Sequence, residues 1–152
     1  MLEVIISIIF AELVGGVSGF LTSGSIQTWF QTLIQPSFQP PNWLFGPAWT
    51  LLYALMGIAA AWIWKKRKNK KARIALGIYG VQLFLNFIWS IIFFGLHSPF
   101  WALIDVVLLW GLIMWMIMKF YVIDKKAGWI LIPYLAWVTF ATVLNFAIWR
   151  LN

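Results

Sequence analysis

Residues 51–95 read LLYALMGIAAAWIWKKRKNKKARIALGIYGVQLFLNFIWSIIFFG, two apolar runs separated by a basic segment. Seven of the eleven lysine and arginine residues lie between Lys65 and Arg73, whereas the apolar runs on either side carry no charge. A helix crosses the hydrocarbon core of a bilayer, which is about 30 Å thick, with about 20 predominantly apolar residues. The stretch therefore predicts two membrane-spanning helices that are joined by a short basic loop.

The composition of the whole chain indicates the same environment. Of its 152 residues, 63% are apolar and only 10% are charged, whereas a soluble domain is about 45–50% apolar and about 25% charged. A soluble domain needs charged side chains to cover its surface, and this chain has too few of them. Membrane lipid is therefore the expected partner of the excess apolar surface, and the length suits one domain.

Five segments are long and apolar enough to cross a bilayer, which predicts an all-α membrane protein that is a bundle of five transmembrane helices. The predicted spans cover about residues 4–21, 43–64, 74–96, 100–118 and 127–149. A long first loop at residues 24–42 contains Pro36, Pro40 and Pro41, which lack amide donors and disfavour helix before them. The other connections are short, so sequential helices should pack as antiparallel neighbours.

The basic residues predict how the bundle lies in the membrane. With the loop at 65–73 placed in the cytoplasm, Lys119, Lys125 and Lys126 fall on the same side, and Arg150 alone falls outside. This distribution follows the positive-inside bias and predicts a cytoplasmic N-terminus. The basic loop is therefore interpreted as a topology signal. No nucleic-acid partner is expected, because so short a loop offers little more than phosphate attraction.

Polar side chains recur inside the predicted spans at helical spacing, together with large aromatic ones. Positions three or four apart share a face of a helix, and this rule gives four stripes: Phe45–Trp49–Tyr53, Gln82–Asn86–Ser90, Trp101–Asp105–Leu108 and Trp137–Ala141–Asn145. Polar and ionisable groups at membrane depth are costly and usually face the bundle interior. The stripes favour a mostly apolar pocket with a few orienting hydrogen bonds. The alternative is that the polar groups bond helix to helix.

Motifs for catalysis or metal binding are scarce. The chain has no cysteine, which excludes disulfides, thiolate metal sites and a cysteine nucleophile. Its one histidine, His97, lies in a predicted turn, and the carboxylates Glu12 and Asp105 lie on different spans. Neither a glycine-rich phosphate loop nor a metal-spaced cluster is present. The sequence therefore predicts no metal site and no cofactor.

Small residues on the first span predict a close helix contact. Gly15 and Gly19 form a GxxxG pattern with Gly16 beside it, and small residues allow two helix backbones to approach closely. The pattern leaves open whether this contact lies within the bundle or between two protomers.

Four strings carry a resemblance to a known family. They are PSFQPPNWLFGPAWTLLYALMG at 36–57, LNFIWSIIFFG at 85–95, WALIDVVLL at 101–109 and PYLAWVTFATVLNFAIWRLN at 133–152. In this order and at this spacing they resemble the TspO/MBR family, the bacterial relatives of the mitochondrial translocator protein, once called the peripheral benzodiazepine receptor. The resemblance covers nearly the whole chain.

The resemblance implies a five-helix membrane fold, often dimeric, with a pocket closed over by the first loop at 24–42. It implies that this pocket binds porphyrins such as protoporphyrin IX and synthetic isoquinoline carboxamides and benzodiazepines. Trp49, Asn86, Trp101, Trp137 and Ala141 match family positions that line the ligand site. Together with the stripes, they give the predicted ligand-binding residues: Phe45, Trp49, Tyr53, Asn86, Phe87, Ser90, Trp101, Asp105, Trp137, Ala141, Leu144 and Asn145.

The function that the resemblance implies is that of a porphyrin-binding sensor or receptor in a bacterial cell membrane, expected as a homodimer. One alternative is degradation of protoporphyrin IX in light and oxygen, with Trp49 and Trp137 as oxidisable electron donors. Tetrapyrrole transport is another alternative. Cholesterol binding is not inferred, because Phe146 stands where the cholesterol motif of mammalian members has tyrosine, and such motifs are weak.

Overall fold

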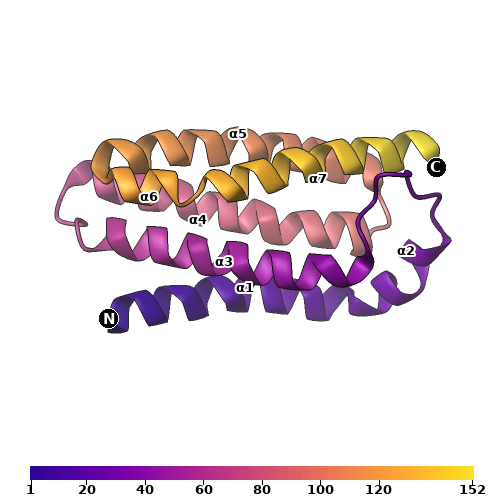
Figure 1. Cartoon of the computed structure of the whole chain (residues 1–152), viewed down its shortest axis with the longest axis horizontal. Helices are drawn as coiled ribbons and strands as arrows, with labels where there is room; N and C mark the ends of the chain where they lie inside the picture. Colours follow the sequence, from indigo (N-terminus) through magenta and orange to yellow (C-terminus); the bar gives the residue numbers. More distant parts are fainter.

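The computed structural model describes all 152 residues, which form helices and no strand. In chain order the elements are α1 (Leu2–Gln27), α2 (Trp29–Thr32), α3 (Asn42–Trp64), α4 (Lys70–Ser90), the π-helical turn η1 (Ile91–Gly95), α5 (Pro99–Ile123), α6 (Lys125–Trp129) and α7 (Ile132–Leu151). Five helical segments are long and apolar enough to cross a membrane, and Figure 1 shows them running side by side along one long axis. The predicted bundle of five transmembrane helices is confirmed.

The ends of these helices have local causes. Asn69 caps α4 by accepting a hydrogen bond from the amide of Lys71 at 2.9 Å, and Asp124 caps α6 by accepting one from the amide of Lys126 at 3.0 Å. Such caps satisfy amides that have no partner within the helix. Pro99 stands in the first turn of α5, where its fixed φ suits a helix start. The short connections that the sequence predicts therefore carry their own stop and start signals.

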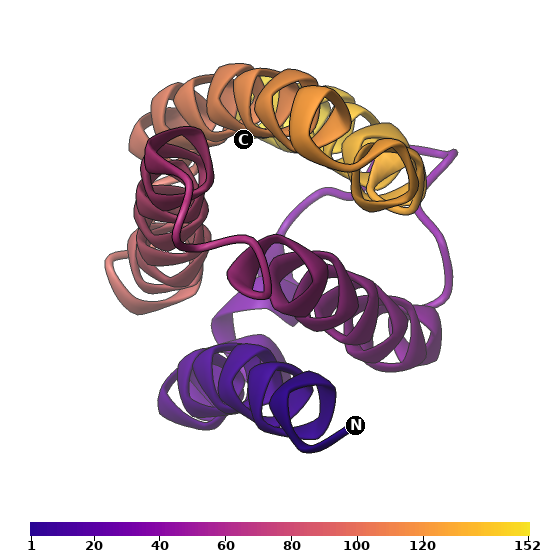
Figure 2. The same cartoon turned by 90° about the vertical axis from the view of Figure 1, so that its left-hand side faces the viewer.

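Helix α1 lies at the edge of the bundle. Figure 2 shows it beside α3 and α4, on the far side of the bundle from α5 and α7. A side chain at Gly57 would lie 2.5 Å from the Cα of Ile8, and one at Gly15 would collide with the ring of Tyr53. The small residues thus allow α1 and α3 to touch within one chain. This settles the role of Gly15, whereas Gly16 and Gly19 face no other residue within 4 Å.

The packed core occupies the end of the bundle that contains the α3–α4 loop. Met56, Ile63, Ile113, Met116 and Phe120 are all fully buried there, in one cluster that joins α3, α4, α5 and α7. Large apolar side chains on the outer faces of the same helices are exposed, as expected for surfaces that contact lipid tails. This end is therefore solid in cross-section.

Ion pairs fasten the polar groups at that same end. Lys66 Nζ lies 2.9 Å from a carboxylate oxygen of Asp124, and Arg67 lies 3.6 Å from Glu3. The Lys66 ammonium also donates to the carbonyl of Ile123 at 2.9 Å. The basic loop, the α5–α6 junction and the start of α1 therefore meet at one end of the bundle. That this end faces the cytoplasm stays a prediction.

At the opposite end, the segment between α1 and α3 crosses the bundle and reaches the end of α7 (Figure 1). The side-chain amide of Asn152 accepts a hydrogen bond from the amide of Ile34 at 2.9 Å and donates one to its carbonyl at 3.0 Å. Trp29 of α2 stacks on His97 with 4.5 Å between ring centroids. Two separate contacts therefore hold this segment against the helix ends.

Candidate ligand-binding cavity

A cavity of about 380 Å³ lies in the half of the bundle that the first loop covers. Its walls come from α1, Phe30 of α2, the first half of α3, the end of α4 with η1, and the middle and end of α7, and no residue of α5 contributes. Half of its 24 lining residues are hydrophobic. Small-molecule sites are mostly apolar hollows of about 300–1,000 Å³ with a few polar groups. The cavity therefore has the size and the lining of a ligand site.

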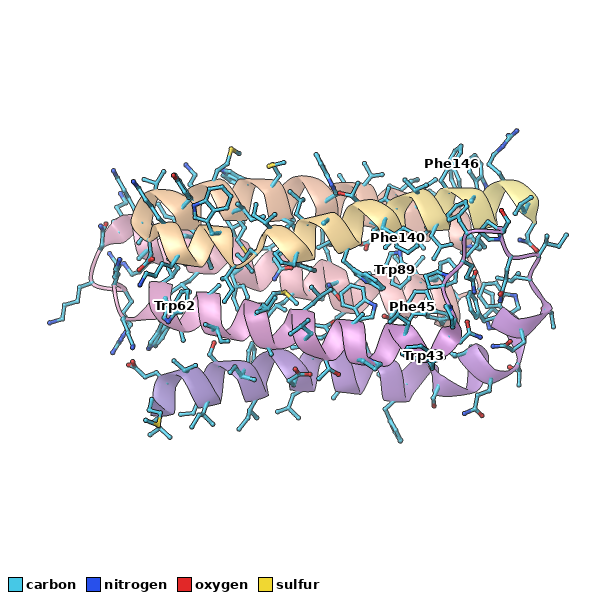
Figure 3. The ribbon with its side chains drawn as sticks, in the orientation of Figure 1. Trp43, Phe45, Trp62, Trp89, Phe140 and Phe146 are labelled. Atoms are coloured by element: carbon cyan, nitrogen blue, oxygen red, sulfur yellow. The ribbon has the colours of Figure 1, made fainter.

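Aromatic rings form the wall that α3 and α7 contribute. Phe45 meets Trp137 edge to face at a centroid distance of 5.9 Å, and Trp49 lies tilted against Tyr53 at 5.7 Å. Figure 3 places Phe45, Trp89 and Phe140 in this half of the bundle, with Trp62 toward the other end. Rings in contact at these distances and angles hold one another in place. The wall offers flat, apolar surfaces to a planar ligand.

A chain of buried hydrogen bonds forms the inner end of the cavity. The hydroxyl of Tyr53 donates to the carbonyl oxygen of Asn86 at 2.7 Å, and the Asn86 amide donates to the hydroxyl of Tyr134 at 2.8 Å. The Tyr134 hydroxyl in turn donates to Gln82 at 2.8 Å, and the Gln82 amide lies 3.6 Å from the sulfur of Met56. The amide of Asn86 is thus already engaged on both its atoms, so it serves first to join α3, α4 and α7.

Two indole groups on the wall differ in how they are satisfied. The N–H of Trp89 donates to Asn145 at 3.0 Å, and the Asn145 amide donates to the carbonyl of Pro99 at 2.8 Å, which ties α4, α5 and α7 together. The N–H of Trp137 is buried and has no partner. A buried indole N–H usually finds an acceptor. The Trp137 N–H is therefore an unpaired polar group enclosed within the wall.

Helix α1 forms the opposite wall, on which Glu12 and Ile26 are the only long side chains. Gly15, Gly16 and Gly19 line it, and the hydroxyls of Ser18 and Thr22 donate to carbonyls of α1 itself at 2.9 and 2.8 Å. Backbone and short hydroxyls leave a smooth surface in front of the aromatic wall. The shape that results is a slot between α1 and the rings of α3 and α7.

Nine of the twelve residues predicted from the sequence lie on the cavity wall: Phe45, Trp49, Tyr53, Asn86, Ser90, Trp137, Ala141, Leu144 and Asn145. Phe87, Trp101 and Asp105 lie outside it. Trp101 is 60% exposed on the outer face of α5, and Asp105 is buried within the bundle with one carboxylate oxygen unpartnered. Both belong to α5, which does not reach the cavity, because α4 and α7 supply the walls on that side.

The α1 wall, and the ring cluster of Trp89, Phe93 and Phe94 that lines the cavity from α4 and η1, are not among the residues predicted from the sequence. Trp89 stacks on Phe93 at a centroid distance of 5.1 Å. The glycine pattern on α1 could have indicated the α1 wall, but such a pattern is equally compatible with close helix packing and with open space. Phe93 and Phe94 lie in the π-helical turn, where the four-residue spacing of an α-helix no longer holds.

Comparison with known proteins gives consistent matches over the whole chain. A model of the TspO/MBR family matches residues 7–150. The tryptophan-rich protein TspO of Archaeoglobus fulgidus is 43% identical over 152 residues, which are 100% of this chain and 98% of that protein. The translocator protein of Homo sapiens is 40% identical over 126 residues, covering 82% of this chain and 75% of that protein. The tryptophan-rich sensory protein of Cereibacter sphaeroides is 38% identical over 124 residues, covering 82% and 77%.

Proposed function

Because this chain belongs to the TspO/MBR family, we propose that it binds planar aromatic ligands of the porphyrin class, protoporphyrin IX among them, in the cavity beside α1. Family membership and the five apolar helices make it an integral, multi-pass membrane protein and support a sensor or receptor role. The same slot suits synthetic isoquinoline carboxamides and benzodiazepines, which are also aromatic and largely apolar. The observation that carries the proposal is a slot with an aromatic wall on one side and glycines on the other.

The slot suits a flat macrocycle for physical reasons. A ring system inserted between α1 and the α3–α7 wall can stack on Trp49 and Trp137, and Gly15, Gly16 and Gly19 leave room for it on the opposite wall. Aromatic pairs prefer offset stacked or edge-to-face arrangements, and these add to the gain from burying apolar surface. Affinity would then rest on stacking and burial, with few hydrogen bonds.

A fluorescence titration tests the proposal. Protein in lipid nanodiscs is titrated with protoporphyrin IX in the dark, and quenching of tryptophan fluorescence is followed. We expect saturable quenching, with an affinity that Trp137→Phe lowers by about tenfold because part of the stacking surface is lost. Ala141→Trp should weaken it further by filling the slot. Trp62→Phe, in the solid half of the bundle, is the matched control and should leave the affinity unchanged. Absence of saturable quenching would contradict the proposal.

A second candidate function is degradation of the bound porphyrin in light. It is favoured by one observation, namely that Trp49 and Trp137 both line the cavity, where their indoles can serve as electron donors to an excited macrocycle with dioxygen as the oxidant. This activity should need light and oxygen and should disappear in the Trp49→Phe, Trp137→Phe double variant. If the double variant still bleaches porphyrin faster than free porphyrin in detergent, the two indoles are not the donors.

A further inference from the structure

Glu12 is the one charged residue on the cavity wall. The chain has four acidic residues, and two of the others, Glu3 and Asp124, form ion pairs at the far end of the bundle. Asp105 lies outside the cavity, and no lysine, arginine or histidine lines it. The electrostatic character of the slot is therefore set by a single carboxylate, which stands about midway along α1.

No group of the protein satisfies this carboxylate. Glu12 makes no ion pair, and no side chain or backbone group donates a hydrogen bond to it. Tyr53, which packs on α1 at Gly15, donates its hydroxyl to Asn86 instead. The residues that follow Glu12 on the same wall are Gly15 and Gly16, which carry no donor side chain. An unpaired carboxylate at membrane depth is costly, and such groups usually mark a functional site.

We propose that Glu12 selects the ligand by its charge, accepting a hydrogen bond or an ion pair from an N–H or ammonium group on a planar aromatic molecule. This inference rests on the function proposed above, since it concerns the same cavity. A ligand amine beside Glu12 supplies the hydrogen-bond donor that the carboxylate lacks within the protein. Hydrogen bonds of this charge-assisted kind are stronger than neutral ones. A carboxylate in the same place meets like charge, and the cavity contains no cation to neutralise it. Ligands should therefore rank amine above neutral ester, and ester above free acid.

Three porphyrins with one macrocycle test this ranking. They are protoporphyrin IX, its dimethyl ester, and the diamide formed with ethylenediamine, whose side chains end in ammonium groups. Each is titrated in the dark into wild-type protein in nanodiscs of neutral lipid, with empty nanodiscs as the blank. The same titrations are made with Glu12→Gln and with Glu3→Gln. The second variant removes one carboxylate from the same helix outside the cavity, where Glu3 faces Arg67 at 3.6 Å.

In the wild type, the diamide should bind at least about tenfold more tightly than the free acid, the scale of one hydrogen bond to a charged group. Glu12→Gln should lower the affinity for the diamide by about tenfold and raise the affinity for the free acid, so that the three ligands no longer differ in the predicted order. Glu3→Gln should keep the wild-type ranking. Unchanged affinity for the neutral ester shows that the Glu12→Gln cavity is still folded, and Glu12→Asp should restore part of the preference.

The outcomes separate the two proposals. If none of the three porphyrins binds saturably to the wild type, the proposed function fails and this inference fails with it. If all three bind but the wild type does not prefer the diamide, or if Glu12→Gln leaves that preference intact, the cavity binds porphyrins and the role assigned to Glu12 is wrong. If both glutamate variants lose the preference equally, net charge rather than Glu12 selects the ligand, which also overturns the inference.

Discussion

In the half of the bundle near the basic loop, Met56, Ile113 and Met116 are fully buried in one continuous core, whereas the half beneath the first loop surrounds a cavity of about 380 Å³. The same kind of residue shapes both halves. Gly57 lets the backbone of α1 touch α3 in the solid half, while Gly16 and Gly19 face open space in the hollow one. Where α1 and α3 lie close together, a glycine allows their backbones to touch. Where the helices lie farther apart, a glycine leaves empty space between them. What matters is the distance between the two backbones.

The largest expected effect comes from breaking the solid half. Gly57→Val places a side chain where the backbone of Ile8 already lies 2.5 Å from a Cβ, and this backbone cannot move aside as a flexible side chain could. We expect a loss of about 3 kcal/mol in unfolding free energy, the upper range for overpacking. Unfolding in mixed micelles with increasing SDS measures it. Gly16→Ala should change the stability little, and equal losses in the two variants would remove the distinction between the halves.

The boundary between the halves is tested by Tyr134→Phe. This change removes the hydroxyl that accepts from Asn86 and donates to Gln82, and it leaves the side-chain nitrogen of Asn86 and the side-chain oxygen of Gln82 without a partner. We expect a loss of about 2 kcal/mol in unfolding free energy, because unsatisfied buried polar groups carry their full desolvation cost. Tyr121→Phe, on a half-exposed tyrosine whose hydroxyl makes no hydrogen bond to the protein, is the control. If Tyr134→Phe leaves the unfolding free energy unchanged, the hydrogen-bond chain does not stabilise the helices around the cavity.

Filling the hollow half should affect binding and spare stability. Gly19→Leu places a side chain into the slot, where no atom lies within 4 Å of an added Cβ. We expect protoporphyrin IX affinity to fall by at least about tenfold, equivalent to about 1.4 kcal/mol. The SDS unfolding midpoint should hold or rise, since glycine is a poor helix former. A fall in both quantities would show that Gly19 packs against another surface, such as a second protomer.

The smallest effect concerns the ion pair at the solid end. The hydrogen bond from Lys66 is the main cause that lowers the pKa of the Asp124 carboxyl below its ordinary value. The unfolded chain binds the proton more tightly, so the stabilisation is present above pH of about 4 and is lost as pH falls through the lower folded pKa. The pair is partly exposed, so we expect only about 0.5 kcal/mol. Unfolding curves of wild type and Asp124→Asn should differ at pH 7 and converge in acid. A constant difference at all pH values would contradict this.

Most of the fold could be predicted from the sequence, because hydropathy and length suffice to identify membrane spans. The end of the first span could not. Predicted at residue 21, the helix continues to Gln27, since Ser23 donates to the carbonyl of Phe20 at 2.9 Å and Thr28 donates to that of Gly24 at 2.8 Å. These polar side chains bond to their own helix. A polar composition that indicates a loop is then compatible with another turn and a half of helix.

The candidate site was predictable only in part, for a geometric reason. Helical spacing shows which residues share a face, and the structure brings the faces of Trp49, Asn86 and Trp137 around the cavity. Spacing does not show which helix that face meets. Trp101 and Asp105 share a face on α5, yet neither reaches the cavity. Glu12 is the only carboxylate of the first predicted span, but its position on the cavity wall depends on how α1 packs against α3.

The glycine wall of α1 also bears on how such a protein can change over generations. Any amino-acid replacement at a glycine codon adds a side chain, so each mutation at Gly16 or Gly19 narrows the slot in a single step and does so without disturbing a contact, since nothing lies within 4 Å. A side chain added at Gly57, in contrast, would clash with the backbone of Ile8. The size of the ligand that fits can therefore change by single substitutions at Gly16 or Gly19. The close contact of α1 with Gly57 tolerates no such change, so the packing of α1 on α3 stays the same.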